Sequence, residues 1–244
     1  MSLSGKIALV TGASRGLGRA IALRLAQEGA AVALNYRERA AEAESVAQEI
    51  RSKGGKAIAL QAHVADAAQV RSMVDRASRD LGPVDILVNN AGISDKRDGP
   101  PSVADPDAVR RVLEVNFFGV LAVTQAMLPL VRNSPSGRIV MVSSGLGSLT
   151  WNSDPAWSFA AVKRMGYNGS KALLNMMTVQ LAWELRDTPI KVNTVNPGFT
   201  ATDLNDHRGT QTVAEGAAET VRQSLAPDDA PTGKFVETGG IAPW

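Results

Sequence analysis

The chain has 244 residues, a formal net charge of +2 and 44% hydrophobic residues, a composition typical of a globular protein. Lys and Arg are scattered rather than clustered, which argues against a nucleic-acid surface. The chain has no cysteine and only two distant histidines, so disulfides, thiolate chemistry and a metal site are not expected. The N-terminus lacks a signal-peptide pattern and no apolar stretch approaches the length of a membrane span. We therefore expect a soluble, cytoplasmic protein.

Short apolar runs alternate with longer helical patterns along the whole chain. The first half predicts a strand over 7–10, a helix over 17–28, a strand over 31–36, a helix over 38–53, a strand over 57–64, a helix over 67–81 and a strand over 84–89. A loop over 94–106 is followed by a helix over 107–131, a strand over 138–142, a helix over 166–186, a strand over 190–195, a helix over 213–225 and a strand over 234–237. This alternation predicts one α/β domain over 1–244. It has a Rossmann-type, doubly wound, mostly parallel sheet of seven strands with helices on both faces.

A glycine-rich segment, Thr11–Gly18, joins the first predicted strand to the first helix. Gly12 allows a tight turn, whereas Gly16 and Gly18 allow the backbone to approach a pyrophosphate. The start of the helix offers N–H groups to the phosphates. A plain turn would also explain such a segment, but its place between a strand and an amphipathic helix favours a dinucleotide site.

The end of the second predicted strand favours NADP(H) over NAD(H). Proteins that bind NAD commonly carry an acid here for the ribose hydroxyls, but Leu34–Arg37 contains none. Arg37, together with Arg15 in the glycine loop, could bind a 2′-phosphate. The alternative is that both arginines are solvated surface residues.

Tyr167 and Lys171 are four residues apart near the start of a predicted helix, so they share one face. A neighbouring ammonium and a cationic nicotinamide would lower the pKa of a tyrosine. The pair alone is common in helices, but further polar residues fall at the same edge of the sheet. They are Ser143 and Ser144 after the fifth strand, Asn116 within an apolar helical pattern, Asn89–Gly92 after the fourth strand and Asn196–Gly198 after the sixth.

In order and spacing, these segments resemble the short-chain dehydrogenase/reductase family over essentially the whole chain. The resemblance implies that Tyr167 is the general acid and that Ser144 binds the carbonyl oxygen of the substrate. It implies that Lys171 holds the nicotinamide ribose, and that Asn116 anchors a water linking Lys171 to solvent. The implied cofactor-binding residues are Gly12, Ser14, Arg15, Gly16, Leu17, Gly18, Arg37, His63, Val64, Asn90, Ala91, Gly92, Tyr167, Lys171, Pro197, Gly198, Thr200 and Thr202.

The chain departs from the family's pattern in three places. His63-Val64 stands where Asp-Val is common, which leaves the adenine contact open. The segment between Ser144 and Tyr167 is longer than usual and holds four large apolar side chains: Trp151, Trp157, Phe159 and Met165. The segment after Gly198 is short where many relatives carry a helical lid. With the end of the chain over 233–244, these features look most like the carbonyl reductase branch.

The resemblance implies an NADPH-dependent reduction of a ketone or aldehyde, with tyrosine as the proton donor. One alternative is a 3-oxoacyl-thioester reductase, which would need a basic surface beside the site for an acidic carrier protein. The other is an inactive NADP(H)-binding sensor, against which the complete Asn, Ser, Tyr and Lys set argues. The aromatic residues of 149–165 either pack on the domain or a neighbouring subunit, or wall an apolar pocket for bulky or aromatic carbonyls. A monomer, a dimer and a tetramer all remain open.

Overall fold

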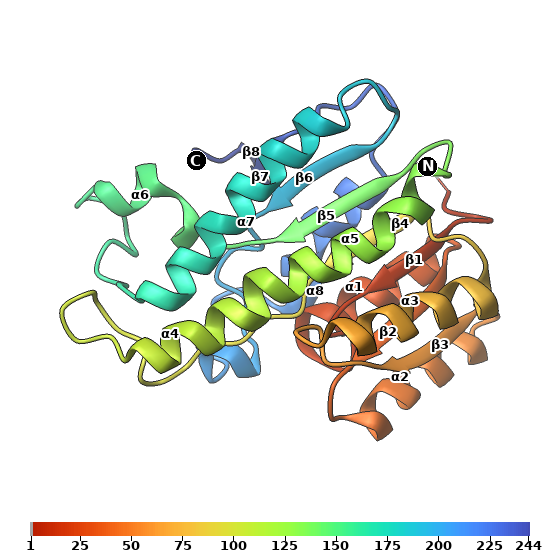
Figure 1. The fold of residues 1–244 in the computed structure, drawn as a ribbon, viewed down its shortest axis with the longest axis horizontal. Helices are drawn as coiled ribbons and strands as arrows, with labels where there is room; N and C mark the ends of the chain where they lie inside the picture. The colour runs from red at the N-terminus through yellow and green to blue at the C-terminus, as the bar shows by residue number, and fades with distance from the viewer. Residues whose placement is uncertain (1) are drawn as a thin grey trace.

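A central sheet with the strand order β3-β2-β1-β4-β5-β6-β7-β8 organises the computed structural model, which describes residues 2–244 (Figure 1). Its strands are β1 (Ile7–Val10), β2 (Ala31–Tyr36), β3 (Ala57–Gln61), β4 (Ile86–Asn89), β5 (Arg138–Val142), β6 (Lys191–Val195), β7 (Lys234–Glu237) and β8 (Gly240–Ile241). The seven predicted strands are confirmed and run parallel. The two-residue strand β8 is added antiparallel to β7 and is too short to leave a sequence pattern.

Helices cover both faces of the sheet, as predicted (Figure 1). One face carries α1 (Gly16–Gln27), α2 (Ala40–Ser52) and α8 (Val213–Ser224); the other carries α3 (Ala67–Leu81), α5 (Gly119–Arg132) and α7 (Met165–Glu184). Two further helices, α4 (Pro106–Leu113) and α6 (Leu149–Ser153), extend beyond the carboxyl ends of the strands. The helix predicted over 107–131 is continuous, but a π-helical turn at Glu114–Phe118 lies between its α-helical parts α4 and α5.

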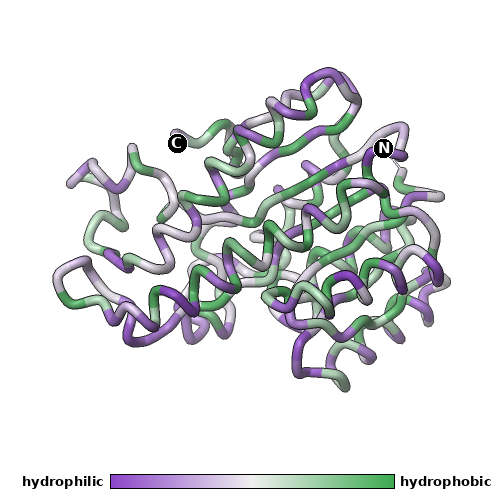
Figure 2. The backbone as a smooth tube through the Cα atoms, in the orientation of Figure 1, coloured by the Kyte–Doolittle hydropathy of each residue, from purple (hydrophilic) through white to green (hydrophobic). Residues whose placement is uncertain are grey.

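Two hydrophobic cores lie on opposite faces of the sheet. Alternation along β1 sends Leu9 into the core beneath α3, α5 and α7, and sends Ala8 and Val10 into the core beneath α1, α2 and α8. Figure 2 shows the hydrophobic residues concentrated in the strands and on the inward sides of the helices. Burial on both faces explains why the strands read as nearly continuous apolar runs in the sequence.

The continuous helix Pro106–Arg132 corrects one expectation. It is long and apolar enough to cross a membrane, by length and composition alone, whereas no such stretch was expected. In the structure α5 packs against α3 and β4, and its residues Val120, Val123 and Met127 belong to the core. Burial in a protein core accounts for this part of its apolar character.

The strand order reverses between β1 and β4, because the chain proceeds from β1 to β2 and β3 on one side and from β4 to β7 on the other. Such a point leaves a crevice at the carboxyl ends of the two strands, and ligands of doubly wound sheets bind there. The loops after β1 and β4 therefore form the candidate site.

Candidate active site

The loop after β1 turns at glycine residues. Gly12 and Gly16 have φ angles of +64° and +52°, a region that side chains of L-residues rarely adopt. At Gly18 a Cβ atom would lie 2.3 Å from the carbonyl oxygen of Gly12 and 2.5 Å from the side-chain nitrogen of Asn90. Only glycine therefore allows α1 to begin this close to the ends of β1 and β4.

The segment after β4 packs directly on this loop. The Thr11 hydroxyl oxygen accepts hydrogen bonds from the backbone N–H groups of Asn90 and Ala91, at 2.9 and 3.0 Å. Asn35, buried in β2, accepts a hydrogen bond from the Gly12 N–H at 3.2 Å and donates to the backbone after β3. Asn35 is absent from the predicted site residues, although a polar residue within an apolar strand is a signal that could have found it.

The N-terminus of α1 is open to an anion. No side chain among residues 2–244 caps this helix, and its first turn contains no acid. Ser14 is half-buried just before the helix, and Leu17 packs on the core of that face. Open N–H groups and the positive end of a helix dipole bind phosphates well. Together with the close approach at Gly18, they fit the pyrophosphate of a dinucleotide.

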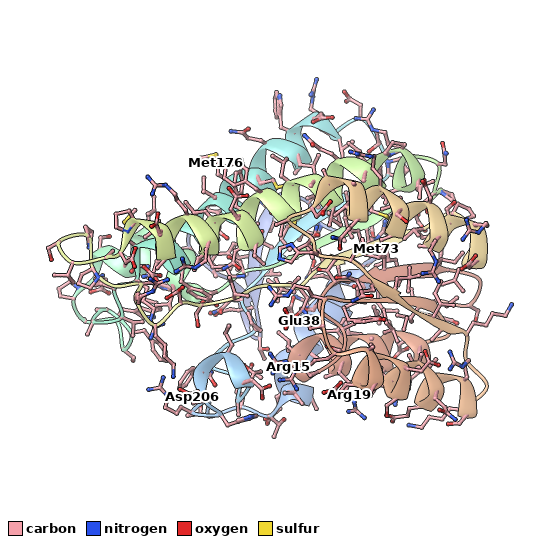
Figure 3. All side chains as sticks on the ribbon, turned by 60° about the horizontal axis from the view of Figure 1, so that its bottom comes forward. Arg15, Arg19, Glu38, Met73, Met176 and Asp206 are labelled. Carbon is pink, nitrogen blue, oxygen red and sulfur yellow. The ribbon has the colours of Figure 1, made fainter. Side chains whose placement is uncertain are left out.

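The two arginines expected to bind a 2′-phosphate both contact acids. Arg15 pairs with Asp203 in the turn after β6, and Figure 3 shows Arg15 facing that turn. Arg37 pairs with Glu38, and a guanidinium nitrogen of Arg37 lies 3.5 Å from Nε2 of His63. Both arginine side chains are about half exposed. A phosphate here would compete with the two carboxylates for the guanidinium groups.

Among the remaining predicted cofactor residues, some side chains lie beside the glycine loop and others point into the protein. Thr202 lies beside the glycine loop, with its methyl carbon 3.7 Å from where a Cβ on Gly16 would be. The turn at 197–198 is half-buried to exposed. In contrast, Val64 is buried in the core, and the buried Thr200 hydroxyl donates to the carbonyl oxygen of Pro197 at 3.0 Å. Val64 and Thr200 therefore direct their side chains into the protein.

Tyr167 and Ser144 come together where β5 ends and α7 begins. Burial raises the pKa of the Tyr167 hydroxyl above its ordinary value, while a hydrogen bond with Ser144 and the charge of Arg164 partly oppose this rise. The sequence predicts that Lys171 lowers the pKa of Tyr167. In the structure, burial is the largest effect on this pKa and raises it. A tyrosine with a raised pKa keeps its proton at neutral pH, as a proton donor must.

Lys171 lies one turn beyond Tyr167 on α7, and only 5% of it is exposed. Its Nζ atom lies 5.7 Å from the centroid of the Tyr167 ring and donates a hydrogen bond to the carbonyl oxygen of Val142 at 2.8 Å. Burial lowers the pKa of the ammonium group to about 8. The ammonium is therefore held at the end of β5, next to Ser144.

Asn116 occupies the π-helical turn and is fully buried. Its side chain accepts a hydrogen bond from the Ile93 N–H at 2.8 Å and donates to the Ser170 hydroxyl at 3.1 Å. A Cβ on Gly92 would lie 3.4 Å from the Asn116 side-chain oxygen and 3.8 Å from Nζ of Lys171. The structure thus gathers the predicted Asn116, Lys171 and Gly92 around one point, and π-helical turns are frequent at functional sites.

The two serines after β5 differ in their surroundings. Ser143 is buried, and its hydroxyl lies 2.9 Å from the side-chain oxygen of Asn175 and 3.2 Å from the carbonyl oxygen of Lys171. Ser144 is half-buried, and its hydroxyl accepts one hydrogen bond from the Leu146 N–H at 3.2 Å. These contacts favour Ser144 as the serine that faces a substrate.

Six aromatic rings form a continuous row beside Ser144, with neighbouring centroids 5.6 to 6.2 Å apart. In spatial order this aromatic row consists of Phe199, Phe159, Trp157, Trp151, Phe235 and Trp244. Carbon atoms of Trp151 and Trp157 lie 3.1 and 3.3 Å from where a Cβ on Gly145, the neighbour of Ser144, would be. The rings therefore pack on this domain, yet Trp157, Phe159 and Phe199 stay half-exposed.

A glycine loop with an open helix end, and a Ser, Tyr and Lys group at the same sheet edge, define a dinucleotide-dependent oxidoreductase. Comparison with known families agrees, because residues 6–212 match the family described as short chain dehydrogenase. The chain belongs to the short-chain dehydrogenase family.

Individual relatives have different names. The 3-oxoacyl-(acyl-carrier-protein) reductase of Staphylococcus aureus is 39% identical over 82% of this chain and 77% of its own. An NADPH-dependent aldehyde reductase-like protein of Arabidopsis thaliana is 38% identical over 84% of this chain and 76% of its own. A short-chain dehydrogenase from Burkholderia cenocepacia, solved in complex with NADP, superposes with a TM-score of 0.82 at 36% identity, covering 97% of each chain.

Proposed function

We propose that this protein reduces a ketone or aldehyde to an alcohol with NADPH, and that Tyr167 donates the proton. The proposal rests on one observation: Ser144, Tyr167 and Lys171 lie close together, at the same sheet edge as the open N-terminus of α1. NADPH, when bound, supplies a hydride to the carbonyl carbon. The proton from the Tyr167 hydroxyl goes to the carbonyl oxygen, so hydride and proton together complete the alcohol.

Each member of the group has a separate task in this proposal. The Ser144 hydroxyl binds the carbonyl oxygen and holds it next to Tyr167. The Lys171 ammonium binds the ribose of the cofactor and stabilises the tyrosinate that remains after proton transfer. Asn116 connects the loop after β4 to α7 through its hydrogen bonds with Ile93 and Ser170. Its proposed task is to bind a water molecule that links Lys171 to solvent.

NADP(H) is the proposed cofactor, for two reasons. Arg15 and Arg37 place positive charge at the end of β2 and the start of α1, where a 2′-phosphate would lie. The solved relative from Burkholderia cenocepacia, which shares 36% of its sequence with this chain, contains NADP. For the adenine contact we retain His63 as a candidate, because its ring lies beside Arg37.

Bulky or aromatic carbonyl compounds are the proposed substrates. The half-exposed rings of the aromatic row, Trp157, Phe159 and Phe199, come from two segments that flank Ser144. Apolar substrate surface buried against them would contribute about 25 cal/mol per Å². These substrates would be consistent with the carbonyl reductase branch of the family.

A 3-oxoacyl-thioester reductase is the second candidate, because the relative from Staphylococcus aureus carries that name. A basic residue, Arg164, directly precedes α7 and could contribute one positive charge to a surface for an acidic carrier protein. The same ketone chemistry would serve both candidates, so the substrate decides between them.

The test follows NADPH oxidation at the nicotinamide absorbance band with aromatic ketones, small aldehydes and an acetoacetyl thioester, free and on acyl carrier protein. Preference for aromatic ketones supports the first candidate, and preference for the carrier-bound thioester supports the second. NADPH binding without reduction of any of these substrates would favour the sensor over both candidates.

Sedimentation of the same preparation distinguishes the monomer from a dimer or a tetramer.

A further inference from the structure

Asp98 is a buried carboxylate in the loop between β4 and α4, and only 7% of it is exposed. Its two oxygen atoms accept hydrogen bonds from the backbone N–H groups of Gly166 and Tyr167, each at 2.8 Å. These are the second and third residues of α7, so one carboxylate occupies two N–H groups in the first turn of this helix. No ion pair within the described part of the chain includes Asp98.

The loop around Asp98 holds the start of α7 at a second point and is itself tied down. The Gly99 carbonyl oxygen accepts a hydrogen bond from the Met165 N–H at 2.8 Å. A Cβ on Gly166 would lie 3.0 Å from Cα of Val109 in α4 and 3.1 Å from an Asp98 oxygen, so this glycine allows both to approach. The start of α7 is thus enclosed by α4 and the loop that precedes it.

This loop also begins in the cofactor site. Its first residues after β4, Asn90 and Ala91, bind Thr11 in the glycine loop, and Ile93 binds Asn116. The eight residues from Ala91 to Asp98 therefore connect the glycine loop to the backbone of Tyr167.

We propose that Asp98 is a positioning residue, which holds Tyr167 against Ser144 by fixing the first turn of α7. The inference rests on the proposed function of Tyr167 as the proton donor. A carboxylate suits this task because it has acceptors only, one for each N–H group. An asparagine would offer one acceptor and place an amide N–H₂ against the other N–H. Loss of one bond lets the first turn fray, and Tyr167 lies in that turn.

The experiment compares Asp98→Asn and Asp98→Ala with Asp66→Asn. Asp66 is the matched control, because it accepts hydrogen bonds from two N–H groups at the start of α3, which contributes no proposed catalytic residue. We expect a kcat for NADPH-dependent reduction about 10- to 100-fold lower in Asp98→Asn, and lower still in Asp98→Ala. The Kd for NADPH should stay within about twofold of wild type, since the phosphate site is untouched.

A spectroscopic signal separates this inference from the proposed function. The chain has two tyrosines, so ¹³C-labelled tyrosine gives two ring signals, and Tyr167→Phe identifies the one from Tyr167. In Asp98→Asn its titration should move down toward the ordinary range for tyrosine, because the hydroxyl becomes more solvated, whereas Asp66→Asn should leave it unchanged. If Asp98→Asn does not fold, Asp98→Ser, which keeps one acceptor, replaces it.

The outcomes are distinguishable. An inactive wild type with the expected change in the Tyr167 signal overturns the proposed function and supports the positioning role. Unchanged kcat and an unchanged Tyr167 signal in folded Asp98→Asn overturn the positioning role. Equal losses of kcat in Asp98→Asn and Asp66→Asn would show a general effect of stability and would also overturn it.

Discussion

Replacing the buried Lys171 with methionine should stabilise the protein at neutral pH while it abolishes turnover. Burial lowers the pKa of this ammonium from 10.5 to about 8, so the charged form is disfavoured in the folded state. At about 1.4 kcal/mol for each pKa unit, this corresponds to a penalty of about 3 kcal/mol. Methionine keeps the apolar stem but loses the hydrogen bond to Val142, which for a charged donor is worth about 2 kcal/mol. The expected net gain at about pH 7 is about 1 kcal/mol.

The stability difference between Lys171→Met and wild type should depend on pH, in a direction that follows from the lowered pKa of Lys171. Between pH 8 and 10.5 the unfolded wild type binds a proton at Lys171 that the folded state has released, so wild-type stability rises with pH in this window. The advantage of Lys171→Met should therefore shrink by about 2 kcal/mol between about pH 7 and about pH 9.5. Urea denaturation at the two pH values measures it, with the exposed Lys234→Met as a control that should show no such trend. A variant less stable than wild type at both pH values, by equal amounts, would refute the reasoning.

Three further predictions concern the reaction. Tyr167→Phe should lower kcat by several orders of magnitude while the Kd for NADPH is retained, and near-normal turnover would rule out the proposed mechanism. Neutral replacements of Arg15 and Arg37 should raise the KM for NADPH far more than the KM for NADH; an equal rise would mean that neither arginine binds the 2′-phosphate. Trp157→Ala should lower kcat/KM for an aromatic ketone about 10-fold and leave a small aldehyde nearly unaffected, with Trp183→Ala, 70% exposed on α7, as the control. Equal effects on both substrates would assign Trp157 to packing alone.

The fold could be predicted because its signals are local. Buried parallel strands such as β5 read as continuous apolar runs, and glycine or proline separates them from helices. The strand β8 could not be predicted, since two residues beside a turn have no periodicity. The π-helical turn within the helix 107–131 could not be predicted either, because it changes the hydrogen bonding around Asn116 without changing the hydrophobic pattern.

The sequence predicted which candidate residues lie close together where a residue type coincides with the end of a strand, as at Ser144, or with the start of a helix, as at Tyr167. Asp98 was missed because its partners, the N–H groups of α7, lie 68 and 69 residues further along the chain. The contact of Arg15 with Asp203, 188 residues away, was missed for the same reason. Spacing placed Lys171 next to Tyr167, but it could not show that burial would dominate the pKa of both groups.

Three buried polar residues lie close to Tyr167 at the carboxyl edge of this sheet. Lys171 is a buried charge, and Asp98 is a buried carboxylate. Asn116 is a buried amide in a helical turn of irregular hydrogen bonding. Each is satisfied by backbone groups: Lys171 by Val142, Asp98 by two N–H groups of α7, and Asn116 by Ile93. Burying a polar group is unfavourable unless it is hydrogen-bonded, so each of the three depends on these backbone contacts. Buried polar groups around a proton donor, each held by backbone contacts, are what a site for proton transfer requires.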